Sequence, residues 1–135
     1  PHISLGHYTH EKNPMACAAG LAVLDVIEEE QLLARSEQLG KAVVARLKQL
    51  ATTLPAIVEV RGAGLLIGIE LGNLGTRDAA DLAEAVLYRC LSEGLSFKVG
   101  QGNVLVLAPP LNVKEDDLWW AIDRIAVALH AECVA

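Results

Sequence analysis

Residues 60–71 read VRGAGLLIGIEL, and this stretch predicts the end of one strand, a tight connection and a second strand. The first strand begins with the apolar residues Ile57, Val58 and Val60. In the second strand every other side chain is apolar, which predicts a strand with one buried face. These alternating residues are Leu65, Ile67, Ile69 and Leu71. Gly62 and Gly64 mark the connection, because glycine is common where a chain turns tightly.

The segment 61–68, RGAGLLIG, has the composition of a glycine-rich phosphate-binding loop. The dinucleotide-binding form of such a loop joins a strand to a helix, whereas here the chain continues directly into a strand. We therefore interpret the segment as a turn or bulge between two strands. Arg61 is expected to pair with a carboxylate rather than to bind a ligand.

Asn13 and Pro14 predict the start of a helix, since asparagine caps helices and proline fits their first position. Apolar residues at helical spacing continue to Ile27. Three glutamates at 28–30 are unfavourable near the C-terminal end of a helix. We therefore expect a break there, after which they serve the first turn of a second helix reaching about Leu50. The inward residues of that helix are Leu39, Val43, Leu47 and Leu50.

The other expected elements are a helix at about 77–92, strands at 95–99 and 104–107, and a helix at about 115–131. The loop 100–103, GQGN, predicts a hairpin. The inward residues of the last helix are Leu118, Ile122, Ile125 and Leu129, with Trp119 on the same side and Trp120 more exposed. The order α-α-β-β-α-β-β-α predicts an α+β fold, a small and largely antiparallel sheet covered by helices.

Length and composition narrow the class of protein. The chain has 135 residues, which predicts one domain or part of a larger protein. Its 53% hydrophobic content excludes a disordered chain, and its net charge of −6 disfavours binding to nucleic acid. No apolar run reaches the roughly 18 residues of a membrane span. The first residues resemble the interior of a protein and carry no signal-peptide pattern, so we expect a fragment.

The cysteines Cys17, Cys90 and Cys133 form no CxxC pair, and we expect buried free thiols in a reducing cytoplasm. Cys17 lies in the segment 16–20, ACAAG, whose small side chains permit a close approach to another backbone. Tight packing in the core and contact with a subunit or domain are both open readings of that segment.

Histidines cluster at the start of the chain, at His2, His7 and His10, with Glu11 beside them. They lack the i, i+4 spacing that presets metal ligands on a helix, and no fourth ligand is evident. We therefore expect no metal site.

Three ordered blocks resemble class III pyridoxal-phosphate-dependent aminotransferases. They are residues 6–27 (GHYTHEKNPMACAAGLAVLDVI), residues 60–71, and residues 107–111 (LAPPL) followed by the acidic start of the last helix. The resemblance implies the C-terminal domain of a fold-type-I pyridoxal-phosphate enzyme. It divides the single domain 1–135 into an interface and phosphate-contact segment (1–13), helices (14–52) and an α+β subdomain (56–135).

The family uses pyridoxal phosphate as an electron sink attached to a lysine. That lysine precedes the threonine block by a few tens of residues, but only eight residues precede Thr9 here. The resemblance therefore implies that the chain carries no catalytic residue and lacks most of the cofactor pocket. It assigns Thr9 a hydrogen bond to the cofactor phosphate of the neighbouring subunit, with His7 and Tyr8 nearby.

One position departs from the family. Members that act on α-amino acids have an arginine two residues before APP, where it holds the substrate carboxylate. Here that position is Val106. We expect the parent enzyme to bind the anion elsewhere or to act on an amine without an α-carboxylate. Lys98 is a candidate substitute, although an exposed strand lysine is the simpler interpretation.

The resemblance implies an enzyme that transfers amino groups between an amine or amino acid and a keto acid, and the family also includes lyases, epimerases and decarboxylases. We expect a cytoplasmic homodimer or larger assembly, an inactive isolated chain, and self-association through the helix that carries residues 16–20. The alternative is a stand-alone, non-catalytic α+β module for binding or assembly.

Overall fold

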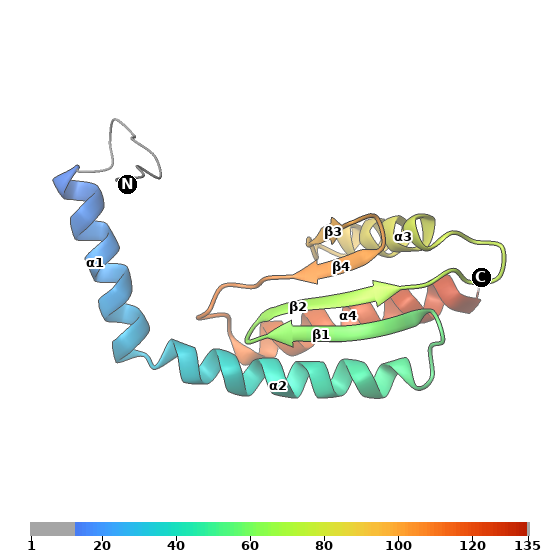
Figure 1. The fold of residues 1–135 in the computed structure, drawn as a ribbon, viewed down its shortest axis with the longest axis horizontal. Helices are drawn as coiled ribbons and strands as arrows, with labels where there is room; N and C mark the ends of the chain where they lie inside the picture. Colours follow the sequence, from blue (N-terminus) through green and yellow to red (C-terminus); the bar gives the residue numbers. More distant parts are fainter. Residues whose placement is uncertain (1–12, 135) are drawn as a thin grey trace, which may run out of the picture.

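The computed structural model describes residues 13–134. Over that range it contains four helices and one sheet of four strands, in the predicted order (Figure 1). The elements are α1 (Pro14–Glu29), α2 (Leu32–Ala51), β1 (Ile57–Ala63), β2 (Leu66–Leu71), α3 (Ala79–Ser92), β3 (Lys98–Gly100), β4 (Val104–Leu107) and α4 (Glu115–Val134). The predicted α+β fold is confirmed.

The sheet has the strand order β1-β2-β4-β3, and all of its pairs are antiparallel. Ala63 pairs with Leu66, so β1 and β2 are joined by a tight turn in which Gly64 has a φ of 55°. The glycine-rich segment is therefore a turn between strands, as predicted. β1 is longer than expected, and β3 is shorter because it begins at Lys98.

α2, α3 and α4 place their apolar residues against one face of the sheet, and α4 lies behind it in Figure 1. The four predicted inward residues of α4 are all buried, and Trp120 is 45% exposed, as expected. Leu50 of α2 is only half-buried, because it packs at the edge of the core. The largest fully buried side chains include Leu47, Ile69, Leu82, Leu105, Ile125 and Leu129.

The turn between β1 and β2 docks onto α2. The hydroxyl of Ser36 accepts a hydrogen bond from the backbone N–H of Leu65 at 3.1 Å. Ser36 is buried, so this bond satisfies a backbone donor that water cannot reach. The contact fixes the β1–β2 turn relative to the helix.

The break between α1 and α2 falls at Glu30 and Gln31, as predicted. Gln31 has a φ of 52°, in the left-handed region, and its side-chain amide donates to the carbonyl of Glu28 at 2.7 Å. The prediction that the glutamates serve the second helix is wrong. They close α1, and the first turn of α2 contains no acidic residue.

α1 projects from the rest of the molecule (Figure 1), and none of its residues is buried. Core packing of the ACAAG segment against the described residues is therefore wrong, because none of the side chains of α1 is buried by residues 13–134. Cys17 is exposed, which also corrects its predicted burial; Cys90 is buried and Cys133 is half-buried. Among the described residues, no helix has both the length and the apolar character needed to span a bilayer.

Candidate functional site

Val106, the position at which the sequence departs from the family, lies on the face of the sheet opposite the core. Arg61 of β1 pairs with Gly68 of β2, Gly68 with Val106 of β4, and Val106 with Lys98 of β3. Directly paired residues of antiparallel strands point to the same face. These four residues therefore form one row across the whole sheet, which we call the Arg61–Lys98 row.

Arg61 is engaged by two carboxylates. Its Nη1 donates to Glu59 at 2.8 Å and to Glu70 at 2.6 Å. The hydrogen bond to Glu70 is the main cause of the raised pKa of Arg61. The prediction that Arg61 pairs with a carboxylate is confirmed, and the guanidinium is held at the β1 end of the row.

The middle of the Arg61–Lys98 row has little side-chain volume. Gly68 has no side chain, and a β-carbon there would lie 3.3 Å from the Cγ1 of Val104 and 3.8 Å from the Cγ of Arg61. A depression of about 470 Å³ lies over this region. Its lining includes Arg61, Gly68, Gln101, Val104 and Val106. A valine rather than an arginine at position 106 leaves this space without a bidentate anion clamp.

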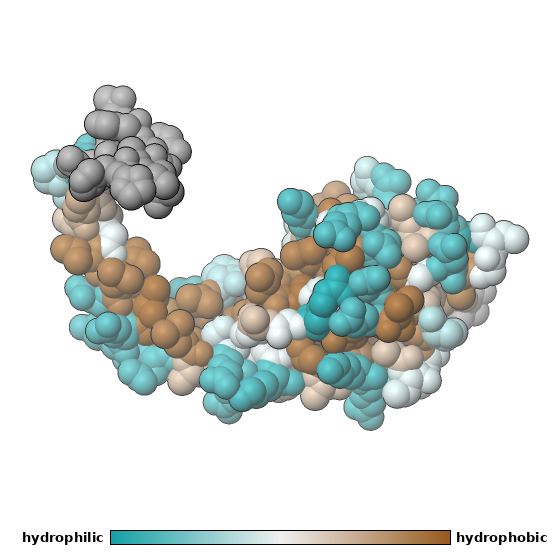
Figure 2. Space-filling model, viewed as in Figure 1, coloured by the Kyte–Doolittle hydropathy of each residue, from teal (hydrophilic) through white to brown (hydrophobic). Residues whose placement is uncertain are grey.

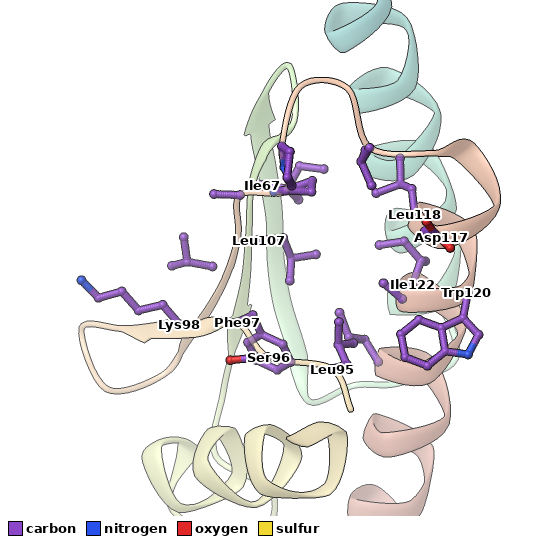
Figure 3. A pocket seen from close by; sticks show the side chains of 17 residues that line it. Ile67, Leu95, Ser96, Phe97, Lys98, Leu107, Asp117, Leu118, Trp120 and Ile122 are labelled. Carbon is purple, nitrogen blue, oxygen red and sulfur yellow. The ribbon is translucent and has the colours of Figure 1, made fainter. Parts of the chain in front are cut away.

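Lys98 is at the other end of the row and is exposed. Within residues 13–134, no carboxylate lies within salt-bridge distance of its ammonium, whereas Lys41 is paired with Glu37. In Figure 3 the Lys98 side chain extends away from α4, to the opposite side of the sheet. The row thus ends in a cation that no described carboxylate neutralises.

A second cavity, of about 610 Å³, lies between the end of the sheet and α4 (Figure 3). Its lining is mainly apolar and includes Leu95, Phe97, Leu107, Leu118, Trp120 and Ile122. Polar side chains are few there, and they include Ser96, Lys98 and Asp117. The cavity suits an apolar group. This cavity is not predictable from the sequence, because residues from β4, α4 and the segment before β3 meet only in the folded chain.

Arg35 of α2 holds the segment that follows Pro109 and Pro110. Its guanidinium donates to the carbonyl of Leu111 at 2.8 Å and to that of Val113 at 2.5 Å. The arginine is half-buried, so these bonds are partly shielded from water. They connect α2 to the chain leaving β4, the strand that carries Val106.

Apolar surface runs along α1 (Figure 2). Five of its large apolar side chains are exposed by 42% to 78%, and they are Met15, Leu21, Val23, Leu24 and Val26. Contiguous exposed apolar surface of this kind marks an interaction site in soluble proteins.

His7, Tyr8 and Thr9, the predicted cofactor-contact residues, lie outside the described residues, as do His2, His10 and Glu11. The lysines among residues 13–134 are all exposed in this chain. They are Lys41, Lys48, Lys98 and Lys114. The first turn of α1 carries no acidic residue that would repel an anion. Among the described residues, the N-terminus of α1 is compatible with an anion, and the structure assigns none of them a contact with the cofactor.

The chain is similar to known proteins over nearly its whole length. A family model described as "Aminotransferase class-III" matches residues 4–129. An (R)-1-hydroxy-2-aminoethylphosphonate ammonia-lyase of Vibrio splendidus (strain 12B01) is 47% identical over 133 residues, covering 97% of this chain and 28% of the relative. An ornithine aminotransferase of Bacillus cereus (strain Q1) is 44% identical over 117 residues, covering 87% of this chain and 27% of the relative.

A solved structure is also similar to this chain. A phospholyase from Arthrobacter in complex with phosphoethanolamine has a TM-score of 0.81 and 32% identity, covering 87% of this chain and 29% of that one. The chain spans less than a third of the length of these proteins.

Proposed function

Because the chain belongs to the class III aminotransferases, we propose that it is the C-terminal part of a pyridoxal-phosphate-dependent enzyme that acts on an amine without an α-carboxylate. We call the longer protein the parent enzyme. The observation that carries the proposal is Val106, which occupies the position where family members that act on α-amino acids have an arginine. Within the Arg61–Lys98 row no arginine other than the paired Arg61 is present to replace it.

The relatives support one substrate class. The ammonia-lyase is named for an aminoethylphosphonate, and the phospholyase was solved with phosphoethanolamine. Both compounds are primary amines that carry a phosphorus oxyanion and no α-carboxylate. We propose a substrate of this class for the parent enzyme, with transamination and elimination as the two candidate reactions.

The described residues contribute binding and shape rather than proton transfer. Pyridoxal phosphate, when bound, supplies the electron sink at the amine carbon. The outer face of the sheet offers a small, open surface at Gly68 and Val106, and Arg35 holds the chain that leaves β4. Thr9, with His7 and Tyr8 beside it, is proposed to bind the cofactor phosphate of a neighbouring subunit.

We propose that the isolated chain is inactive, because the cofactor-bearing lysine belongs to the rest of the parent enzyme. The exposed apolar face of α1 supports assembly as a homodimer or larger, with α1 covered in that assembly. Three free cysteines support a cytoplasmic setting.

The test is substrate preference in the full-length parent enzyme. We expect turnover of an aminoethylphosphonate and poor use of ordinary α-amino acids. Val106→Arg is expected to improve kcat/KM for α-amino acids by about tenfold, since it restores a charge-assisted carboxylate contact. Val127→Arg adds the same charge on an exposed part of α4 and is expected to change nothing. The proposal fails if the wild-type enzyme uses α-amino acids efficiently and loses that activity when Val106 is changed.

The second candidate is a stand-alone, non-catalytic module for binding or assembly. It is favoured by the continuous core that α2, the sheet, α3 and α4 form on their own. Sequencing the reading frame upstream of Pro1 separates the two. A frame that continues into a lysine-bearing segment supports the enzyme, and a start codon immediately before Pro1 supports the module.

A further inference from the structure

We propose that the apolar cavity between the end of the sheet and α4 holds a segment of the parent enzyme that lies outside this chain. We call it the β4–α4 cavity, and its occupant is an apolar stretch of polypeptide. The inference rests on one part of the proposed function, that this chain is the C-terminal part of a longer protein. It is independent of the substrate.

The β4–α4 cavity lies where two strands separate. β3 and β4 are paired as far as Lys98 and Val106, and the pairing ends there. Beyond that point residues 95–97 and 107–110 line the cavity on one side, and α4 lines it on the other (Figure 3). Paired strands lie about 4.8 Å apart and leave no such space between them. The separation of the strands therefore opens the sheet toward α4.

The β4–α4 cavity reaches the hydrophobic core. Ile67, Ile122 and Ile125 are among the residues that line it, and each of these side chains is at most 2% exposed. Protein interiors are close-packed, with few voids larger than a water molecule. A cavity of about 610 Å³ beside core side chains is far larger than such a void. Its size indicates that the core is completed by residues outside the described part of the chain.

The side chains around the opening favour an apolar occupant. Trp120 is 45% exposed, and the half-buried Phe97 also lines the cavity. Lys98 is one of the few polar residues of the lining, but in Figure 3 its side chain extends away from α4. Such a lining offers little that would orient a small polar substrate. Apolar side chains of a polypeptide would be removed from water here, and so would the indole of Trp120.

The parent enzyme is large enough to supply the occupant. This chain spans less than a third of the length of the relatives that it matches. A parent of similar length therefore has more than twice as many residues outside this chain as within it. A second copy of the chain is the competing occupant, and the experiment separates the two.

The experiment measures the accessibility of a thiol in the full-length parent enzyme. Ala121→Cys places the thiol in the wall of the β4–α4 cavity, and Ala126→Cys places it on α4 outside the lining. Both alanines are half-buried in this chain, so the pair is matched. Alkylation by N-ethylmaleimide is followed by peptide mass spectrometry, and each rate is divided by its rate in denaturant. Ala121→Cys is expected to react about tenfold more slowly than Ala126→Cys, because reaction requires the occupant to leave.

A second variant tests whether the space is filled. Ala121→Phe adds an aromatic ring to the wall of the cavity. The ring is expected to lower the thermal midpoint of the parent enzyme by about 3 °C or more, because it overpacks an occupied site. An open cavity would accept the ring without loss of stability.

The outcomes are distinct. The proposal is overturned if Ala121→Cys reacts as fast as Ala126→Cys, or if Ala121→Phe leaves the thermal midpoint unchanged. Protection of Ala121→Cys that disappears when the parent enzyme is diluted to monomers assigns the cavity to a second copy and also overturns it. An open cavity in a longer parent sinks this inference alone. A reading frame that begins at Pro1 sinks the inference together with the proposed function.

Discussion

Gly40 of α2 lies directly against Gly64 in the β1–β2 turn: a β-carbon at position 40 would lie 2.0 Å from the carbonyl oxygen of Gly64. The obstacle is backbone, which cannot rotate away as a side chain can. Beside this contact, the Ser36 hydroxyl accepts a hydrogen bond from the backbone N–H of Leu65. The turn is thus fixed to the helix by two adjoining contacts, and only glycine fits at the closer one.

Gly40→Ala is expected to destabilise the chain by about 1–3 kcal/mol, because the added methyl group forces α2 away from the turn. Chemical denaturation measures the change. Gly20→Ala is the control, since nothing lies within 4 Å of a β-carbon there. That control is expected to be neutral or to stabilise α1 by about 0.5–1 kcal/mol. Equal effects of the two substitutions would contradict the close contact.

Glu132 joins α4 to both Arg77 and Arg89. Its carboxylate is bonded to Arg89 Nη2 at 2.6 Å and to Arg77 Nη2 at 3.0 Å, and its side chain is only 12% exposed. Both arginines, Arg89 above all, lower the pKa of Glu132 below its ordinary value of 4.5. Glu132→Gln is expected to cost about 1–2 kcal/mol at neutral pH, after allowance for screening of the more exposed arginines.

This difference is expected to depend on pH. The unfolded chain takes up the proton at a higher pH than the folded one, so the stabilisation is complete above the ordinary pKa and is lost as the pH falls through the lowered folded pKa. The stability curves of wild type and Glu132→Gln should therefore converge in acid. Glu37→Gln, which breaks an exposed pair with Lys41, is expected to give no measurable change. A wild-type-to-variant difference that grows in acid would refute the assignment.

Arg35→Met is expected to loosen the segment after Pro110, since the carbonyls of Leu111 and Val113 lose their donors. The expected result is faster amide exchange near the start of α4 and a loss of about 1–3 kcal/mol. Hydrogen exchange followed by mass spectrometry locates the change. Arg46→Met on the exposed side of α2 serves as the control. Unchanged exchange in Arg35→Met would show that other contacts hold this segment.

The isolated chain is expected to self-associate through α1, because its apolar side chains have no partner in the described chain. Leu21→Lys, at a position 62% exposed, is expected to shift the light-scattering mass toward the monomer. Leu66→Lys, on the sheet at 59% exposure, is the matched control. A wild-type chain that stays monomeric at high concentration would count against this surface.

The order of α2, α3 and α4 was predictable because each of these helices buries an apolar stripe that is visible in the sequence. In α4 the apolar residues at 118, 122, 125 and 129 recur at helical spacing, and all four are buried. The same reasoning failed for Cys17. Its neighbours have the small, apolar character of a buried stripe, but burial also needs a facing surface, and residues 13–134 provide none.

The candidate site was less accessible to prediction. Val106 was identified from the resemblance to a family. The pairing of Arg61 with a carboxylate was predicted from the charge of its side chain. The adjacency of Val106 and Lys98 depends on a register in which Gly100 pairs with Val104. Alternation alone cannot select that register, because it does not specify which residues of two strands face each other. The role of Thr9 stays a prediction.

Gln31 affects the placement of α1. α1 has 16 residues and is about 24 Å long at the usual helical rise. A rotation of about 10° at residue 31 therefore moves its far end by about 4 Å. The left-handed backbone of Gln31 therefore sets the direction of α1 relative to the sheet that carries Val106 and Lys98. The N-terminal end of α1 is thereby placed relative to that sheet by the backbone conformation of a single residue.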